Sequence, residues 1–255
     1  MKNLFNLDGK VVIVTGSSKG IGLAMVEGLA TFGAKVVISS RKQEVCDEEA
    51  ERLKKMGFDA IGIACHVGDE AQCRNLVKKT LEQFGRIDVL INNAAINPVY
   101  GGLSKMTGEV FDKIMQVNVR APFILSNLVY PIMKSQNSGS IIHISSVEGV
   151  KPGVGMGLYS LTKASLLMLT KSQAKEWGRV GIRVNSILPG LIKTKFSSAL
   201  WKNEELMAYM EKTLPSRRMA EPKEMVGLAI FLASEAASYC TGSSFVADGG
   251  YLVAG

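Results

Sequence analysis

The sequence predicts a single α/β domain built on a doubly wound, seven-stranded parallel sheet with helices on both faces. Short β-branched runs that lack polar alternation alternate with stretches of helical period along the whole chain. The 255 residues suit one large domain, and no linker, low-complexity tract or fixed-period repeat divides them. Hydrophobic residues at 47% and charged residues at 21% are typical of a chain that folds around a core.

Seven apolar runs are expected to form the strands: 11–14, 36–38, 60–63, 89–91, 141–144, 184–187 and 245–246. The predicted helices between them are 21–32, 43–56, 70–84, 107–134, 159–177 and 222–233. Gly33, Gly57 and Gly85 follow three of these helices, where left-handed C-caps commonly stand. The amphipathic insertion 193–214 is not needed to complete the sheet, and we expect it to form a substrate lid over the ligand site at the carboxyl ends of the strands.

Composition argues against several classes of protein. The formal net charge is +7, but the basic residues are scattered without a stripe interleaved with aromatics, so a nucleic-acid binder is the weakest alternative. No apolar run approaches the roughly 20 residues of a membrane span, and no secretory signal is recognisable, so a cytoplasmic location is expected. No metal site is expected from two histidines and four cysteines without zinc spacing, and we interpret all four cysteines as reduced: Cys46, Cys65, Cys73 and Cys240.

A glycine-rich loop joins the first predicted strand to the first predicted helix. Gly16, Gly20 and Gly22 have the spacing G-x-x-x-G-x-G, which differs from the G-x-G-x-x-G fingerprint. Glycines at this position let the backbone approach a pyrophosphate, whose charge meets the free N–H groups at the helix start. The loop therefore predicts a dinucleotide-binding, or Rossmann, domain, with a ligand-free turn as the plainer alternative.

The end of the second predicted strand indicates which dinucleotide is used. An NAD-dependent fold usually has an acidic residue here for the ribose 2′-hydroxyl, but this chain reads Ser39-Ser40-Arg41-Lys42. The guanidinium of Arg41 can bind a 2′-phosphate bidentately, and Lys19 offers a second cation. These residues favour NADP over NAD, the alternative being that the cations are only solvated surface charges.

A third motif places a phenol and an ammonium on one face of a predicted helix. Tyr159 and Lys163 are four residues apart, and Ser146 ends the fifth predicted strand, at the edge of the sheet where ligands bind. A free tyrosine has a pKa of about 10, and a nearby ammonium stabilises the phenolate. The pattern predicts that Tyr159 acts as a proton donor and acceptor.

Together with Asn92-Asn93-Ala94-Ala95, Val117-Asn118-Val119 and Pro189-Gly190, these motifs resemble the classical short-chain dehydrogenase/reductase family over residues 7–250. Within the family, Cys65-His66-Val67-Gly68 and the residues around Asn93 and Pro189 look like the NADP-dependent carbonyl reductases of the dehydrogenase/reductase member 4 type. The resemblance implies an oxidoreductase that transfers a hydride between NADP(H) and a carbonyl or secondary alcohol. It also implies a homo-oligomer, a tetramer.

The resemblance implies a catalytic tetrad of Asn118, Ser146, Tyr159 and Lys163. Tyr159 would protonate the carbonyl oxygen, Ser146 would hydrogen-bond it, Lys163 would hold the nicotinamide ribose and lower the pKa of Tyr159, and Asn118 would position a water. The cofactor site implied by the resemblance comprises Gly16, Ser18, Lys19, Gly20, Ile21, Gly22, Ser40, Arg41, His66, Val67, Asn93, Ala94, Tyr159, Lys163, Pro189, Gly190, Ile192 and Thr194. His66 departs from the family pattern, which has an aspartate there.

Substrate specificity is expected in the residues after Asn93, in 147–158 and in the lid. The residues expected to contact the substrate are Ile96, Val147, Glu148, Met156, Leu191, Phe196 and Trp201. This wall is mostly apolar, which favours a hydrophobic ketone or aldehyde, while Glu148 either contacts a substrate hydroxyl or amine or faces solvent. Two alternatives remain: a 3-oxoacyl thioester (acyl-carrier-protein) reductase, and a non-catalytic NADP-sensing regulator, which would have no need of Tyr159.

Overall fold

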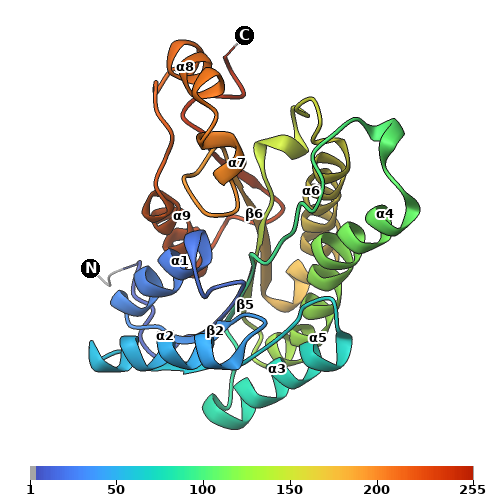
Figure 1. The fold of residues 1–255 in the computed structure, drawn as a ribbon. Coiled ribbons are helices and arrows are strands. Elements are labelled where there is room, and N and C mark those ends of the chain that lie inside the picture. Colours follow the sequence, from blue (N-terminus) through green and yellow to red (C-terminus); the bar gives the residue numbers. More distant parts are fainter. Residues whose placement is uncertain (1–3, 255) are drawn as a thin grey trace.

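The computed structural model describes residues 4–254, and within them one parallel sheet of seven strands forms the centre of the molecule (Figure 1). The strands occupy the predicted runs and lie in the order β3-β2-β1-β4-β5-β6-β7. Their bounds are β1 Val11–Thr15, β2 Lys35–Ser39, β3 Ala60–Gly62, β4 Val89–Asn92, β5 Gly139–Ile144, β6 Ile182–Pro189 and β7 Ser244–Ala247. The strand order reverses between β1 and β4, so a ligand crevice is expected at their carboxyl ends.

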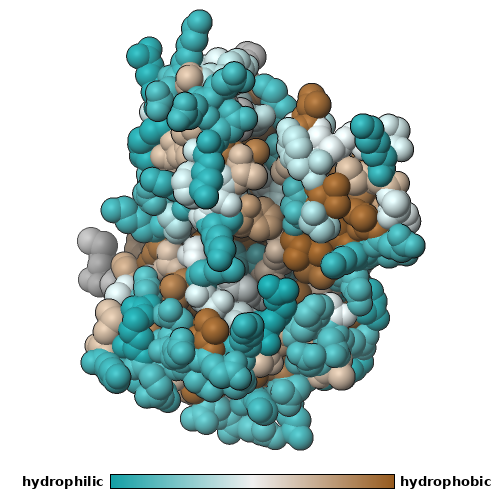
Figure 2. All heavy atoms as spheres, viewed as in Figure 1, coloured by the Kyte–Doolittle hydropathy of each residue, from teal (hydrophilic) through white to brown (hydrophobic). Residues whose placement is uncertain are grey.

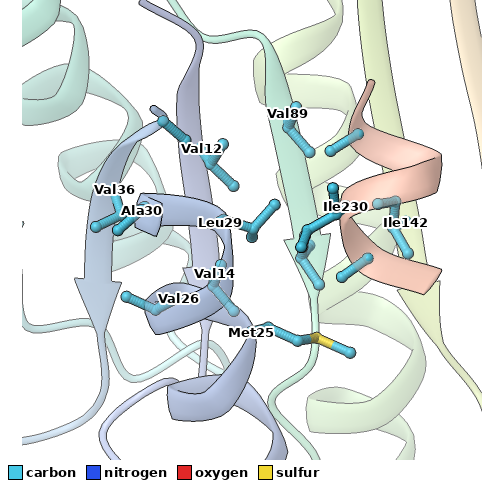
Figure 3. Packing of buried hydrophobic residues seen from close by; sticks show 14 of the residues in the cluster. Val12, Val14, Met25, Val26, Leu29, Ala30, Val36, Val89, Ile142 and Ile230 are labelled. Carbon is cyan, nitrogen blue, oxygen red and sulfur yellow. The ribbon is translucent and has the colours of Figure 1, made fainter. Parts of the chain in front are cut away.

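Two helical layers cover the sheet and confirm the predicted fold class. Buried side chains of α1 (Gly20–Thr31), α2 (Gln43–Lys55) and α9 (Val226–Ala233) form one core with the strands, part of which Figure 3 shows. Those of α3 (Glu70–Phe84), α5 (Ala121–Ser135) and α6 (Gly157–Trp177) form the other. Gly33, Gly57 and Gly85 have φ of +93°, +90° and +73°, so each predicted cap is left-handed.

The stretch predicted as one helix over 107–134 is continuous but irregular. It consists of α4 (Gly108–Met115), a π-helical segment (Gln116–Arg120) and α5. The second residue of α5 is Pro122, which has no N–H to donate to the carbonyl of Asn118 four residues earlier. A wider turn avoids this missing bond, and it brings Asn118 into the chain's functional region.

The insertion 193–214 carries two further helices, α7 (Ser198–Trp201) and α8 (Glu204–Thr213), which project beyond the carboxyl ends of the strands in Figure 1. Its base is fixed, because Lys193 N donates to Ala220 O at 2.9 Å and Ala220 N to Leu191 O at 3.2 Å. Short 3-10 segments complete the chain at Leu103–Lys105, Val147–Gly149, Gly178–Val180, Pro222–Met225 and Glu235–Ala237. No helix within 4–254 is long and apolar enough to cross a membrane.

Candidate functional site

The glycine loop packs so closely against the end of β4 that side chains are excluded. A Cβ on Gly16, whose φ is +65°, would lie 2.9 Å from the Cα of Ala94. A Cβ on Gly22 would lie 2.5 Å from Nδ2 of Asn93, which donates to Gly16 O at 3.1 Å and Thr15 O at 2.7 Å. The structure therefore brings Gly16, Gly22, Asn93 and Ala94 together and leaves the bare backbone at the start of α1 open to an anion.

Two hydroxyl groups of this loop were missed by the sequence reasoning, which considered only the glycine spacing. Thr15 Oγ1 accepts from the backbone N–H groups of Asn93 at 3.0 Å and Ala94 at 3.1 Å. Ser17 Oγ donates to Val14 O at 2.6 Å and accepts from Ser39 N at 2.9 Å. Both side chains are buried, so they hold the loop in shape. Their signal in the sequence was a hydroxyl residue flanking the first glycine on each side.

The far end of the loop offers unpaired positive charge. Lys19 and Arg41 are exposed, and neither side chain has a hydrogen bond or ion pair with any group of the described chain. Ser40 is fixed beside them, because its N–H donates to the sulfur of Cys46 at 3.2 Å and its carbonyl accepts from Cys65 N at 2.7 Å. A free cation on the glycine loop and another after β2 suit the binding of a phosphate group.

The remaining residues predicted at this end stand on the glycine loop, after β3 and at the base of the lid. His66 is exposed, and its backbone N–H donates to the side chain of Gln72 at 2.8 Å, while Val67 is half-buried. Ser18 and Ile21 are half-buried at the start of α1. A Cβ on Gly20 would lie 3.4 Å from Cγ2 of Thr194, so the base of the lid reaches the glycine loop.

Ser146, Tyr159 and Lys163 come together at the carboxyl end of β5. All three are buried, with 8%, 8% and 2% of their surface exposed. Lys163 Nζ donates to Ile144 O at 2.7 Å and lies 5.4 Å from the centre of the Tyr159 ring. Ser146 Oγ accepts from Glu148 N at 3.1 Å, which turns the chain away from the strand. The strand terminus and the one-turn spacing on α6 thus place a hydroxyl, a phenol and an amine in one buried cluster.

The pKa of Tyr159 differs from the expectation that Lys163 would lower it. Burial raises the pKa of Tyr159, the carboxylate of Glu148 raises it further, and a hydrogen bond with Ser146 opposes both effects. Burial also lowers the pKa of Lys163 to about 7, so much of its charge is lost near neutral pH. The sequence argument assumed a solvated ammonium, whereas desolvation penalises the charged form of both groups.

Asn118 lies in the π-helical segment, and its buried amide makes three hydrogen bonds. Its Oδ1 accepts from Ile96 N at 2.8 Å, and its Nδ2 donates to Ile96 O at 2.9 Å and to Thr162 Oγ1 at 3.1 Å. Thr162 Oγ1 in turn donates to the carbonyl of Tyr159 at 2.7 Å. Asn118 therefore joins the segment after β4 to α6. The sequence reasoning missed Thr162, although it stands within the Tyr159–Lys163 motif.

A second buried polar layer lies beneath this cluster and was also missed. His143 on β5 contacts Asn92 Nδ2 through Nδ1 at 3.2 Å and Gln173 Oε1 through Nε2 at 3.0 Å. Burial lowers the pKa of His143 to about 4, so the ring is neutral. Ser145 Oγ donates to Lys163 O at 2.7 Å. These bonds fix α6 against β5. The only sign of them in the sequence was the presence of polar residues within and directly after an apolar strand.

On the substrate side, Phe196 of the lid faces the cluster, 54% exposed and 6.0 Å from Tyr159 between ring centres. Val147 is buried, whereas four other predicted residues are half-buried: Ile96, Met156, Leu191 and Trp201. The sulfur of Met156 accepts a hydrogen bond from Asn97 Nδ2 at 3.3 Å. Trp201 Nε1 donates to Thr194 O at 2.8 Å. Figure 2 shows a hollow between the lid and the loops above α4 and α6.

Glu148 does not simply face solvent. It is half-buried, and its Oε2 accepts from Gly153 N and from Ser160 Oγ, both at 2.8 Å. These bonds shape the loop between Ser146 and α6, so one carboxylate oxygen is already used within the chain.

The residues after β6 are divided between core and surface. Pro189 is buried at the strand end, and a Cβ on Gly190 would lie 2.7 Å from the Cα of Asp248. The side chain of Ile192 packs into the core, 4% exposed, and its carbonyl accepts from Ser197 Oγ at 2.5 Å, so the side chain is not available to a cofactor. No group of three or more His, Cys, Asp or Glu residues in the described part of the chain could hold a metal ion.

A doubly wound sheet with a glycine loop at its switch point is typical of dinucleotide-binding proteins. Residues 16–252 match the family model described as enoyl-(acyl carrier protein) reductase. The chain belongs to the short-chain dehydrogenase/reductase family, and it is therefore an oxidoreductase of the class that acts on CH–OH and C=O groups with a nicotinamide cofactor.

Relatives confirm the narrower resemblance as well. Dehydrogenase/reductase SDR family member 4 of Homo sapiens is 42% identical over 244 residues, which cover 96% of this chain and 88% of the relative. Tropinone reductase-like 3 of Erythroxylum coca is 40% identical over 243 residues, 95% of this chain and 93% of that protein. The crystal structure of a gluconate 5-dehydrogenase from Burkholderia cenocepacia J2315 in complex with NADP and tartrate superposes with a TM-score of 0.96 at 33% identity, covering 99% of each chain.

Proposed function

We propose that the chain is an NADP-dependent carbonyl reductase that converts a hydrophobic ketone or aldehyde to the alcohol. The observation that carries this proposal is the buried cluster of Ser146, Tyr159 and Lys163 beside a glycine cradle. A protein that only senses a cofactor has no use for such a cluster. The relatives named as reductases support the same reaction class.

The residues present fit a dinucleotide with a 2′-phosphate. The cradle at Gly16 and Gly22 admits only bare backbone, which suits a pyrophosphate at the start of α1. Arg41 and Lys19 lack protein partners within 4–254, and no acid stands at the end of β2 to repel a phosphate. When bound, NADPH supplies the hydride that reduces the carbonyl carbon. The gluconate 5-dehydrogenase structure with NADP supports this choice of cofactor.

The chain's own residues would handle the proton and the developing charge. Ser146 Oγ would donate a hydrogen bond to the substrate oxygen as negative charge grows on it. Tyr159 would give that oxygen its proton, and the raised pKa of Tyr159 keeps the phenol protonated at neutral pH. Asn118 would hold α6 against Ile96, so that the phenol stays aimed at the substrate. Lys163 would bind the nicotinamide ribose from the same face of α6.

The apolar wall formed with Ile96, Met156 and Phe196 supports a hydrophobic substrate. The family-model description supports one alternative, the 3-oxoacyl thioester reductase, because it names an acyl-carrier-protein enzyme. NADPH oxidation by the purified protein would be measured against aryl ketones, bicyclic ketones, aldehydes, quinones and acetoacetyl thioesters. We expect turnover of the hydrophobic ketones, with an NADPH preference over NADH of at least about tenfold in kcat/KM. Turnover of thioesters alone, or of none of these compounds, would refute the proposal.

We also infer a homo-oligomer, a tetramer, in the cytoplasm. Large apolar side chains stand exposed on α4, α5 and α6: Phe111, Phe123, Leu161 and Met168, between 39% and 61% exposed. Figure 2 shows apolar surface gathered over the region of α4. Exposed apolar area of this kind is typical of a surface that a second subunit covers.

A further inference from the structure

The segment 248–254, here termed the C-terminal turn, follows β7 and folds back toward the substrate side of the site. The carboxylate of Asp248 shapes it, because Oδ1 accepts from Gly250 N and Oδ2 from Leu252 N, both at 2.8 Å. Gly249 and Gly250 have φ of +64° and +90°. A carboxylate cap and two left-handed glycines give the turn a defined conformation.

One side of the C-terminal turn packs against the two residues that follow the lid, Pro215 and Ser216. Ser216 N donates to Gly249 O at 3.0 Å. A Cβ on Gly249 would lie 2.3 Å from Ser216 Oγ, and one on Gly250 would lie 2.5 Å from Pro215 Cγ. Pro215 and Ser216 follow shortly after α8, which ends at Thr213, so the position of the turn and the position of the lid are linked.

The other side of the C-terminal turn contacts the loop that leads from Ser146 to α6. Lys151 Nζ donates to Ala254 O at 3.0 Å and lies 5.4 Å from the centre of the Tyr251 ring. The same loop is held in shape by Glu148 through Gly153 and Ser160. Lys151 therefore connects the loop after Ser146 to the C-terminal turn. That turn contacts the residues that follow the lid, so Lys151 links the loop to the lid indirectly.

Tyr251 is half-buried, and its ring contacts the ammonium of Lys151. Burial raises the pKa of Tyr251, and Glu148 and Tyr209 on α8 raise it further. No motif singled out Tyr251 in the sequence.

We propose that Tyr251 is a specificity-determining residue, and that its contact with Lys151 is a clasp that joins the lid to the loop after Ser146 and limits the size of the substrate. The inference rests on the proposed carbonyl reduction. With the clasp in place, the lid and the loop close around a compact ketone. This closed arrangement would leave too little space for a steroid-sized ketone.

Four variants test the clasp. Tyr251→Ala removes the ring, Lys151→Met removes the cation, and Tyr251→Phe keeps the ring and the cation contact. Tyr239→Ala is the matched control, because Tyr239 is fully exposed and has no part in the site. The ratio of kcat/KM for an aryl methyl ketone to kcat/KM for a steroid ketone is measured for each variant, together with hydrogen exchange across 193–214.

Tyr251→Ala and Lys151→Met are each expected to lower this ratio by at least about tenfold and to speed exchange in 193–214. The double variant should lower the ratio no further than the more severe single variant, since both changes break the contact between Tyr251 and Lys151. Tyr251→Phe and Tyr239→Ala should keep the ratio within about twofold. An unchanged ratio or unchanged exchange in Tyr251→Ala would overturn the clasp. If the parent protein reduces no ketone, the proposed function fails, and the exchange measurement still decides whether the clasp exists.

Discussion

Replacing Lys163 with methionine is expected to stabilise the folded chain at acidic and neutral pH while it removes the amine proposed to hold the nicotinamide ribose. The side chain is 2% exposed, and its one protein hydrogen bond in the described chain goes to Ile144 O. Burial lowers its pKa to about 7 from an ordinary value of 10.5. Folding must therefore place a charge in apolar surroundings, or remove the proton, and either process costs free energy.

The sign and size of the effect come from the two pKa values. Below pH 7 the lysine is charged in both states, so the cost is complete, about 5 kcal/mol for this difference in pKa. Between pH 7 and 10.5 the unfolded chain binds more protons, so the cost fades as pH rises. Losing the hydrogen bond to Ile144 offsets about 1.5–3 kcal/mol. We expect Lys163→Met to gain about 2–3 kcal/mol at pH 6 and little by pH 9.5.

Thermal unfolding followed by circular dichroism at pH 6 and pH 9.5 measures the difference. A gain of this size corresponds to a rise in Tm of about 4–10 °C for a chain of this length. Lys171→Met, an exposed lysine on the same helix, is the control and should leave Tm nearly unchanged. A lower Tm for Lys163→Met at pH 6, or a gain that does not depend on pH, would show that the buried amine is not a source of strain.

Four further outcomes are expected. Tyr159→Phe should lower kcat by about 10²–10⁴-fold with NADPH binding intact, and a variant that retains a tenth of the parent rate would exclude Tyr159 as the acid. Arg41→Asp should change the ratio of kcat/KM with NADPH to kcat/KM with NADH by at least about tenfold in favour of NADH. An unchanged ratio would show that Arg41 does not bind the 2′-phosphate. Hydrogen exchange across 193–214 should slow once NADPH and a ketone analogue bind, whereas full protection in the free protein would indicate a rigid insertion. Light scattering should give the mass of a tetramer, and a single-chain mass would contradict it.

The sheet and its helices could be predicted because their signals are local and repeated. Runs such as 11–14 and 36–38 are apolar on both faces, a pattern typical of a parallel strand covered on both sides. The π-helical segment escaped prediction because the helical period continues through Gln116–Arg120. Pro122 was the available signal, because it falls in the interior of the predicted helix 107–134, where a proline marks a kink or an irregular turn.

The candidate site was predictable where chemistry and spacing agree, as for Tyr159 and Lys163 on one helix face. The pKa directions were not, because burial of both groups depends on how β5, α6 and the 147–156 loop pack. The partners of Asn118 and of Tyr251 lie 22 residues or more away along the chain, at Ile96 and Lys151. A single sequence carries no record of such distant contacts.

The π-helical segment makes the placement of Asn118 depend on the number of residues between α4 and α5. An α-helix turns about 100° and rises about 1.5 Å for each residue, so a wide turn takes up one extra residue without rotating α5 against α4. Deleting one residue from Gln116–Arg120 would therefore let α4 and α5 merge into a regular helix with their alignment unchanged, but it would remove the wide turn in which Asn118 stands. The core face of α5, with Leu125 and Val129, would stay against the sheet, while Asn118 would lose the backbone geometry that places its amide against Ile96 and Thr162. The length of this short segment is therefore as strict a requirement as the identity of its asparagine.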